Sequence, residues 1–555
     1  MDTNTGFSNS KDNNIERITP KITEPQMNTR KRLRSTTSRT TKSAKRRKTI
    51  KPTKKVLTLL NKEETVRQST FLKKICSDAG QCIVFGKEND RIKDYFDNFD
   101  LNSDSIDIAN IKRIGGESAN GFVTELPFVK DDYHAYTVLK SSRTSKADNL
   151  FYEAFVGVFI NKMNKYYPCF LETYNSYTYS NENVYEKFKE GVPVTQEEMT
   201  TINKMTNGLE YNLFVDKEKL DYSCGKSKYV ALEVQHLNNV TSLDSWFAKN
   251  KQDEYSFTVD LVNYLYQVYC PLSFMSDEFT HYDLHSDNVL IYYPSNDNNK
   301  YIKMVYHYPD GTVVEFRTKG IVKIIDYGRN YFNDKEENID SKMFYNRLCN
   351  LNLKSCNYKT KNTNKDYSWK HSNEVTCGEM SGYSILGKED EYGSFHYISS
   401  QKRNKSHDLR LANIIKYTSY KYASKDTDKE QNEFYIREIL RQIVYENKYQ
   451  LKEEGIDERF GTPEVPRDSY ENLGIIRNVD DMHLALKKLI QEREYFKRKN
   501  DSLYGVKNGK DGKNLMGTLH VYMDRSKPIE YIPYQYLPNT RTKPKTAQLS
   551  SVSNL

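Results

Sequence analysis

The sequence lacks the cysteine pairs that build small metal or disulfide frameworks. Its eight cysteines are scattered, and no two of them form a CxxC pair. Neither a zinc ribbon nor a disulfide framework is therefore indicated. Cys349, Cys356 and Cys377 do lie near His371 in the chain. That cluster leaves two interpretations open, a metal site or ordinary thiols in an irregular segment.

Long apolar runs are also lacking. Hydrophobic residues make up 37% of the chain and the mean hydropathy is −0.83, so the sequence predicts a soluble protein. No run is long enough to span a bilayer, and we expect no membrane partner. The first residues, MDTNTGFSNSKDNN, are polar and predict no secretory leader, which favours an intracellular, reducing compartment.

Excess positive charge is lacking from most of the chain and is concentrated at its start. Residues 1–55 contain 16 Lys or Arg and 4 Asp or Glu, a net charge of +12, whereas the whole chain carries +9. These residues show no apolar periodicity and are rich in Ser, Thr and Asn, so we expect a disordered tail. Its basic clusters, 30–34 and 45–48, allow three roles: nuclear import, nonspecific nucleic-acid contact through residues 30–55, or solubilisation alone.

After the tail, the apolar patterns change from mainly β to mainly helical. In chain order they predict strands at 111–128 and 133–142, a helix capped by Asp148 at 148–167, strands at 182–188 and 228–237, an amphipathic helix at 254–279, a hairpin turning at Asp310-Gly311 and a strand within 300–328, helices over 408–499, and a small β element at 514–535. This order indicates an α+β fold with two lobes. The expected segments are a disordered basic tail at 1–55, an extension packed on the core at 56–110, an N-lobe at 111–237, a C-lobe at 238–500 with an irregular insert at 328–405, and a β element and tail at 501–555.

A small-residue segment lies between two of the predicted strands. Gly116, Ser118 and Gly121, followed by Val123, would let backbone N–H groups approach a phosphate closely. The spacing is that of a kinase glycine-rich loop in which Ser118 replaces the middle glycine. An ordinary β-turn is the alternative interpretation.

A lysine and a glutamate follow this segment at suggestive positions. Lys140 ends the strand AYTVLK, and Glu153 lies on the next predicted helix. A carboxylate that holds a lysine keeps the ammonium charged and aims it at phosphates. Glu153 could instead be a surface residue of the helix, because other glutamates lie close by in the sequence.

The stretch HYDLHSDN, from His281 to Asn288, carries the most specific signal. Asp283 can orient or deprotonate a hydroxyl, and the amide of Asn288 can bind Mg²⁺. Asp326 then follows the apolar strand IVKII, where a buried carboxylate needs a cation or donors. In this order and spacing, the three residues predict a phosphotransferase that uses ATP and Mg²⁺.

These motifs resemble the eukaryotic-type protein kinase superfamily, and more closely the serine/threonine kinases of large nucleocytoplasmic DNA viruses. Phrases that carry the resemblance include SANGFV, DNLFYEAFVG, THYDLHSDNVLIY, IIDYGRNYF and LHVYMDRSKPIEYIP. Together with the other matching phrases they extend from about residue 70 to 537. The resemblance implies a two-lobed kinase-like fold that transfers phosphate from ATP to viral or host proteins, in the host cytoplasm, the nucleus or the virion.

The resemblance also implies roles for single residues. Lys140 would anchor ATP with Glu153 as its partner, and Asp283 would be the catalytic aspartate. The Mg²⁺ ligands would be Asn288 and Asp326. Backbone groups of Gln235 and His236 would bind adenine. Asp408 would brace the catalytic loop.

The sequence departs from the family pattern at three places. His285 stands where serine/threonine kinases have a lysine that neutralises the transferred phosphate, and a histidine can take this catalytic role only when protonated. Tyr327 replaces a phenylalanine, and residues 328–405 contain no Ala-Pro-Glu. Two other functions stay open, a small-molecule phosphotransferase of the aminoglycoside or choline type and a non-catalytic kinase-like virion or interaction protein.

Overall fold

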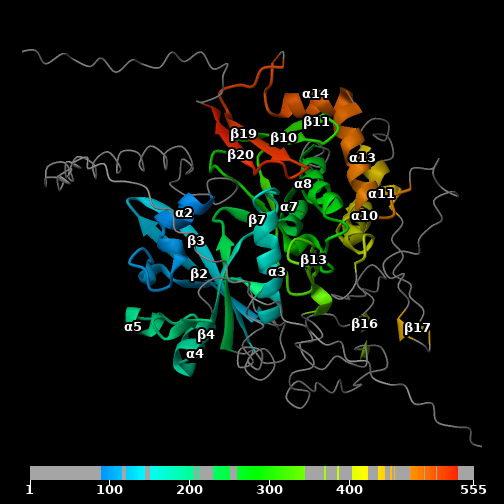
Figure 1. Ribbon diagram of the computed structural model, residues 1–555. Coiled ribbons are helices and arrows are strands. Elements are labelled where there is room, and N and C mark those ends of the chain that lie inside the picture. The colour runs from blue at the N-terminus through cyan, green and yellow to red at the C-terminus, as the bar shows by residue number, and fades with distance from the viewer. Residues whose placement is uncertain are drawn as a thin grey trace, which may run out of the picture. The chain divides into compact units, whose positions relative to one another are not determined.

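The computed structural model shows mixed helix and sheet content (Figure 1). It describes residues 89–115, 121–143, 150–205, 209–211, 229–250, 259–343, 368–370, 384–386, 403–422, 435–443, 451–452, 455–456, 475–492, 494–507 and 509–534. All of these belong to one compact unit, Thr65–Leu555. The basic tail, Asp148, the cysteine cluster and the loop residues Gly116 and Ser118 lie outside the described residues.

The described residues between Lys112 and His236 contain a six-stranded antiparallel sheet. Its strands, in spatial order, are β1 (Lys112–Ile114), β2 (Gly121–Lys130), β3 (Tyr133–Ser142), β6 (Val230–His236), β4 (Thr173–Tyr179) and β5 (Ile202–Lys204). β2 and β3 pair over their full lengths, from Gly121 opposite Ser142 to Lys130 opposite Tyr133. The turn between them places Asp131 and Asp132 at φ 49° and 67°, as a two-residue hairpin requires. The strand predicted at 133–142 is thus confirmed, whereas the described part of the single strand predicted at 111–128 forms two antiparallel strands, β1 and β2.

One predicted strand is a helix. Residues 182–188 belong to α4 (Glu182–Glu190), which begins after Asn181, whose side chain accepts a hydrogen bond from the N–H of Asn183. The helix ends at Gly191 in the left-handed conformation, φ 73°. Both ends therefore carry ordinary helix signals, a polar N-cap and a C-terminal glycine. The prediction was wrong because aromatic and β-branched residues were given more weight than these caps.

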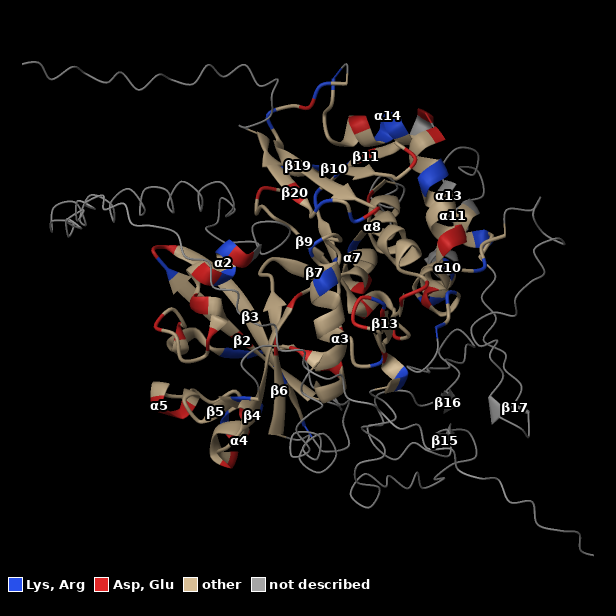
Figure 2. Ribbon diagram, in the orientation of Figure 1, with Lys and Arg blue, Asp and Glu red and all other residues tan. Residues whose placement is uncertain are grey.

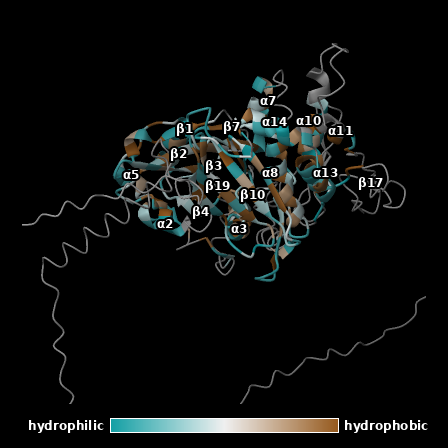
Figure 3. Cartoon of the chain, turned by 90° about the horizontal axis from the view of Figure 1, so that it is seen from above, coloured by the Kyte–Doolittle hydropathy of each residue, from teal (hydrophilic) through white to brown (hydrophobic). Residues whose placement is uncertain are grey.

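Two helices are buried on almost every side. α3 (Leu150–Met163) buries twelve of its residues, and α8 (Leu261–Phe274) buries all but its last two. Because so little of α8 is exposed to solvent, the predicted amphipathic character was wrong, and the helix ends at Phe274 rather than at 279. The hydropathy colouring shows the contrast between such central elements and the hydrophilic α14 (Glu494–Leu503) (Figure 3). A buried helix gives the segments packed on it a rigid support.

A second sheet joins residues that are far apart in the chain. Its four strands are β11 (Val313–Thr318), β10 (Tyr301–His307), β19 (Leu515–Tyr522) and β20 (Glu530–Pro533). β10 and β11 form the predicted hairpin, and Gly311 adopts φ 80° in its turn. β19 pairs in parallel with β10, which places the C-terminal β element beside this hairpin.

Further elements complete the described fold. They are α2 (Asn89–Tyr95), η2 (Asp97–Phe99), η3 (Ile108–Asn110), α5 (Gln196–Met199), β7 (Val240–Ser242), α7 (Leu243–Asn250), β8 (Phe279–Thr280), η7 (Ser286–Asn288), β9 (Val289–Tyr292), β12 (Ile321–Ile324), β13 (Tyr331–Asp334), β14 (Ile339–Asp340), β15 (Ser368–Lys370), β16 (Ser384–Leu386), η8 (His407–Leu409), α10 (Arg410–Tyr422), α11 (Tyr435–Arg441), β17 (Leu451–Lys452), β18 (Gly455–Ile456) and α13 (Val479–Glu492). β7, β9 and β12 form one small sheet, and β8, β13 and β14 form another.

The segment before β1 packs against the six-stranded sheet. Phe96, Phe99 and Leu101 are fully buried in a hydrophobic cluster that includes residues of β2 and β4. Lys93 on α2 donates a 2.7 Å hydrogen bond to the Glu172 carboxylate, just before β4. Figure 2 shows charged residues on α2 next to largely uncharged strands. Among the described helices, none is long and apolar enough to cross a membrane.

A buried carboxyl group lies within the six-stranded sheet. Glu233 on β6 is completely buried and accepts hydrogen bonds from Thr137 (2.9 Å), Asn175 (3.1 Å) and Tyr177 (3.0 Å). Burial raises the pKa of Glu233 to about 7, although the three donors favour its charged form. The folded protein therefore binds this proton more tightly than the unfolded chain does.

Glu233→Gln should change the pH dependence of stability. Wild-type Glu233 disfavours the folded state increasingly as pH rises from about 4.5 to 7, by roughly 3 kcal/mol in total. The variant lacks this titration, so between pH 5 and pH 8 it should gain about 2–3 kcal/mol relative to wild type, measured by urea unfolding. Glu198→Gln is the control, because interactions with Lys187 and Thr195 lower the pKa of exposed Glu198 and place its titration below this range. A pH-independent difference for Glu233→Gln would contradict the prediction.

Candidate active site

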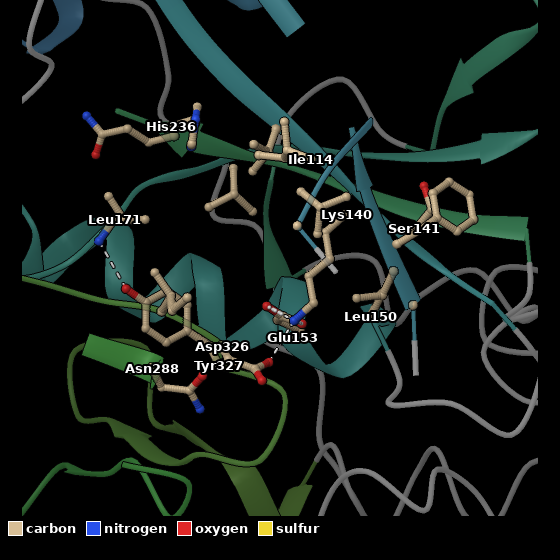
Figure 4. A pocket seen from close by; sticks show the side chains of 18 of the residues that line it. Ile114, Lys140, Ser141, Leu150, Glu153, Leu171, His236, Asn288, Asp326 and Tyr327 are labelled. Carbon is tan, nitrogen blue, oxygen red and sulfur yellow. Dashed lines mark hydrogen bonds and ion pairs between the residues drawn. The ribbon is translucent and has the colours of Figure 1, made fainter. Parts of the chain in front are cut away.

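A pocket of about 630 Å³ opens between the six-stranded sheet and the segments around β9 and β12. Apolar side chains of both parts line it, among them Val123, Val138 and Leu290. Charged and amide groups gather in the same pocket, including Lys140, Glu153, Asn288 and Asp326 (Figure 4). An apolar wall with a few convergent polar groups is the usual form of a small-molecule site.

Lys140 lies between two carboxylates from different elements. Its Nζ is 2.7 Å from an oxygen of Glu153 on α3 and 2.7 Å from Oδ1 of Asp326 after β12 (Figure 4). Burial would lower the pKa of Lys140, yet Asp326 and Glu153 hold that pKa above its ordinary value. The lysine therefore stays charged. Glu153 is buried, so the alternative of a surface glutamate is wrong.

Asp326 is held in an uncommon backbone conformation. Its φ is +71°, and the following Tyr327 is buried. The Tyr327 hydroxyl donates to the carbonyl of Ile324 (2.7 Å) and accepts from the N–H of Leu171 (3.0 Å) (Figure 4). These bonds tie the Asp326 turn both to β12 and to the chain that enters β4. The hydroxyl that a phenylalanine would lack is thus part of the support.

The loop that carries Asp283 is braced from behind by Asp408. The Asp408 carboxylate accepts hydrogen bonds from the N–H groups of His281 (2.8 Å) and Tyr282 (3.0 Å). Tyr282 adopts φ +63°, a strained conformation that such bonds help to maintain. The His281 ring hydrogen-bonds through Nε2 to the carbonyl of Ile325 at 3.0 Å, and burial lowers the pKa of His281 to about 4. A neutral ring therefore links the two loops.

Two arginines flank the Asp283 carboxylate. Arg410 Nη1 is 2.7 Å from Oδ1, and Arg329 Nη1 is 3.5 Å from Oδ2. Burial alone would raise the pKa of Asp283, but Arg329 and Arg410 outweigh it and hold the pKa well below its usual range. Asp283 is consequently ionised throughout the physiological range.

His285 lies beside Asp283 but is uncharged at neutral pH. Its Nε2 is 3.9 Å from Asp283 Oδ1, and its Nδ1 accepts a hydrogen bond from the N–H of Asp287 at 3.3 Å. Burial lowers the pKa of His285, an effect that the nearby Asp283 only partly offsets. A histidine could replace the lysine only with a protonated ring, and burial disfavours that protonated form at position 285.

The structure brings most of the other predicted residues to the same pocket. Val123, Gln235, His236 and Asn288 all line it. The backbone N–H of Gln235 donates to the carbonyl of Glu172 at 2.7 Å, and the Gln235 Oε1 accepts from the N–H of Glu172 at 3.5 Å, so the N–H expected to bind adenine is already used within the fold. Asn288 donates its amide N–H to the Asp283 carbonyl at 2.9 Å, which leaves its amide oxygen for another role.

The residues present fit a nucleotide with its metal ion. A Cβ added to Gly121 would lie 2.5 Å from the carbonyl oxygen of Ser141, so only glycine allows the chain to run this close to β3. Asn288 and Asp326 offer an amide and a carboxylate oxygen, the ligand types that Mg²⁺ prefers. Among the described residues, no group of three or more His, Cys, Asp or Glu side chains could hold a metal ion. A magnesium site here would therefore depend on the amide and on ligand phosphates.

Sequence reasoning missed the two arginines. Arg329 directly follows Gly328, and Arg410 lies 127 positions after Asp283 in the chain. No periodicity or spacing rule connects residues that far apart, and the fold shows that Arg410 contacts the loop that carries Asp283. A weak signal existed for Arg410, because it stands two residues after Asp408, which had been expected to brace the loop.

Comparisons with known proteins give little sequence similarity. No protein-family model matches the chain, and no curated protein matches it. Among solved structures, a crystal structure of a kinase domain matches with 13% identity and a TM-score of 0.22, over 40% of this chain and 51% of that chain. The match thus spans about half the length of that domain. The function of the site therefore has to be inferred from its own residues.

Proposed function

We propose that this protein is a kinase that transfers the γ-phosphate of ATP to Ser or Thr hydroxyls of proteins. One observation carries the proposal: Lys140 joins Glu153 and Asp326 at 2.7 Å each, in a pocket that also contains Asn288. Phosphoryl transfer needs this set of groups, a cation for the phosphates and oxygen ligands for a metal. On this proposal, the six-stranded sheet and the α8-centred part are the two lobes of a kinase-like fold.

The two ends of the pocket suit the two ends of ATP. The apolar side chains near Val138 and Leu290 would cover the flat adenine ring, and Lys140 would contact the phosphates. Bound Mg²⁺, held by Asn288 and Asp326, would neutralise phosphate charge.

The proposed reaction forms one bond and breaks one. The acceptor hydroxyl oxygen bonds to the γ-phosphorus, and the bond from that phosphorus to the β–γ bridging oxygen breaks, so ADP leaves with the electron pair. The hydroxyl proton passes late to the Asp283 carboxylate, once bond formation has made it acidic. Because two arginines hold Asp283 ionised, its main task is to orient the hydroxyl rather than to act as a strong base.

The acceptor class is proposed from the sequence motifs. The motifs resemble kinases of large DNA viruses, so viral or host proteins are the acceptors we propose. The depth at which Asp283 lies, with a side chain 13% exposed, suits a hydroxyl on a projecting side chain. Small hydroxylated metabolites and a purely structural role are the competing possibilities, and one experiment separates all three.

The test follows radiolabel from γ-labelled ATP. The purified full chain is incubated with MgCl₂ and either a mixed protein acceptor or hydroxylated metabolites, and the phosphoamino acids are identified. We expect Mg²⁺-dependent labelling of serine and threonine, and none with Asp283→Ala. Labelled metabolites alone would support the small-molecule enzyme. Equal, Mg²⁺-independent signals for wild type and variant would reject the enzyme.

A further inference from the structure

The catalytic loop has a charge requirement that its own residues do not meet. Asp283 and Asp326 bring two carboxylates to this region, one 3.5 Å from Arg329 and the other 2.7 Å from Lys140, and ATP would add several more negative charges. Lys140 is already shared between two carboxylates. His285, the loop residue placed to help, has a pKa lowered by burial. The cations that contact the Asp283 carboxylate come instead from outside its own loop.

Arg410 is the cation with the shortest contact to Asp283 in the part of the chain that the structure describes. It is the first residue of α10, and its Nη1 donates a 2.7 Å hydrogen bond to Oδ1 of Asp283. Asp408, two residues earlier, holds the backbone of the same loop through the N–H groups of His281 and Tyr282. One short segment thus fixes both the loop backbone and its carboxylate.

The position of Arg410 is unfavourable for the stability of its own helix. A cation in the first turn of a helix opposes the helix dipole. The Nε of Arg410 is buried and has no hydrogen-bond partner among the described residues. Neither feature favours folding, so the contact with Asp283 accounts for an arginine at this position.

We propose that Arg410 is a positioning residue for the phosphate transfer: its guanidinium fixes the Asp283 carboxylate toward the acceptor and supplies the positive charge that His285 does not. The inference rests on the proposed function and deepens it. Arg329, at 3.5 Å from the other carboxylate oxygen, supports the same orientation from the Asp326 side. The paired arginines leave Asp283 little freedom to turn away from the acceptor.

Three variants at one position test this role. Arg410→Gln should lower kcat at least about a hundredfold while the KM for ATP changes little, because the positioning acts on the acceptor side. Arg410→Lys should keep part of the activity. Free guanidinium at millimolar concentration should restore part of the activity of Arg410→Ala. Arg477→Gln is the matched control, because Arg477 also pairs with an aspartate, Asp481 at 3.3 Å, near the start of a different helix, α13.

The pH profile supplies a readout that a purely structural role would not change. Without Arg410 the Asp283 carboxylate loses one neighbouring cation, so the acid limb of kcat/KM should move to higher pH. Unchanged or increased transfer by Arg410→Gln would overturn the proposal. Loss of activity in all three Arg410 variants, with neither rescue by guanidinium nor a shift of the pH profile, would overturn it as well. Absence of transfer by wild type would instead reject the proposed function, and the role of Arg410 with it.

Discussion

Lys140→Met is expected to reduce phosphate transfer by at least about a thousandfold. The lysine is the group that joins α3 to the Asp326 turn, and on the proposed function it is the cation that would contact the phosphates. Methionine keeps most of the side-chain volume but removes the charge. Initial rates with saturating γ-labelled ATP measure the effect. Lys112→Met is the control, because Lys112 lies in the same sheet, is 62% exposed and pairs with Glu125.

The same substitution should lower stability, which makes a second variant necessary. Loss of the ammonium leaves the Glu153 carboxylate, 4% exposed, without its cation. Breaking a buried pair in this way costs about 3–5 kcal/mol, and less here because Asp326 is 32% exposed. Lys140→Met combined with Glu153→Gln should recover much of the stability but none of the activity. Recovery of activity in the double variant would show that Lys140 serves the fold alone.

Asp326→Asn is expected to have an equally large effect with little loss of folding. Asn tolerates the left-handed backbone conformation at φ +71° that Ala would strain. The variant would lose the anionic ligand of the proposed metal site, and several kcal/mol of transition-state stabilisation correspond to about a thousandfold in rate. It should also respond weakly to added Mg²⁺.

The measurement is a magnesium titration of transfer, run beside a thermal melt. Asp297→Asn serves as the control, since Asp297 is an exposed loop carboxylate that accepts from Asn299. Asp297→Asn should match wild type in both assays. If Asp326→Asn transferred phosphate at the wild-type rate, with the wild-type magnesium dependence and melting temperature, Asp326 would not belong to the proposed metal site.

Short-range patterns in the sequence predicted much of the fold. The β10–β11 hairpin was predicted because the turn residues Asp310-Gly311 stand between two apolar runs, and β3 was predicted from its own apolar pattern. Lys140, Glu153 and Asp326 were singled out from order and spacing, and the structure places their charged groups in contact. Their catalytic and ligand-binding roles remain predictions.

Long-range packing set the limit of prediction. α8 was expected to be amphipathic, but elements from distant parts of the chain bury nearly all of it. The parallel pairing of β10 with β19 connects residues more than 200 positions apart. The contact of Arg410 with Asp283 has the same origin. Sequence periodicity predicts which faces of one segment are apolar, whereas these features depend on which distant segment packs against it.

The Tyr327 hydroxyl, with one bond to Ile324 and one to Leu171, has a consequence for the range of conformations that the pocket samples. Turning the ring out of its site would break two buried hydrogen bonds, at a cost of about 2–4 kcal/mol. The rotated state would then make up roughly 0.1% to a few per cent of the molecules. A compound that binds only that state would have its apparent affinity reduced by the same fraction, whereas one that fits the pocket as it stands would not. This single hydroxyl thus favours ligands that leave Tyr327 in place.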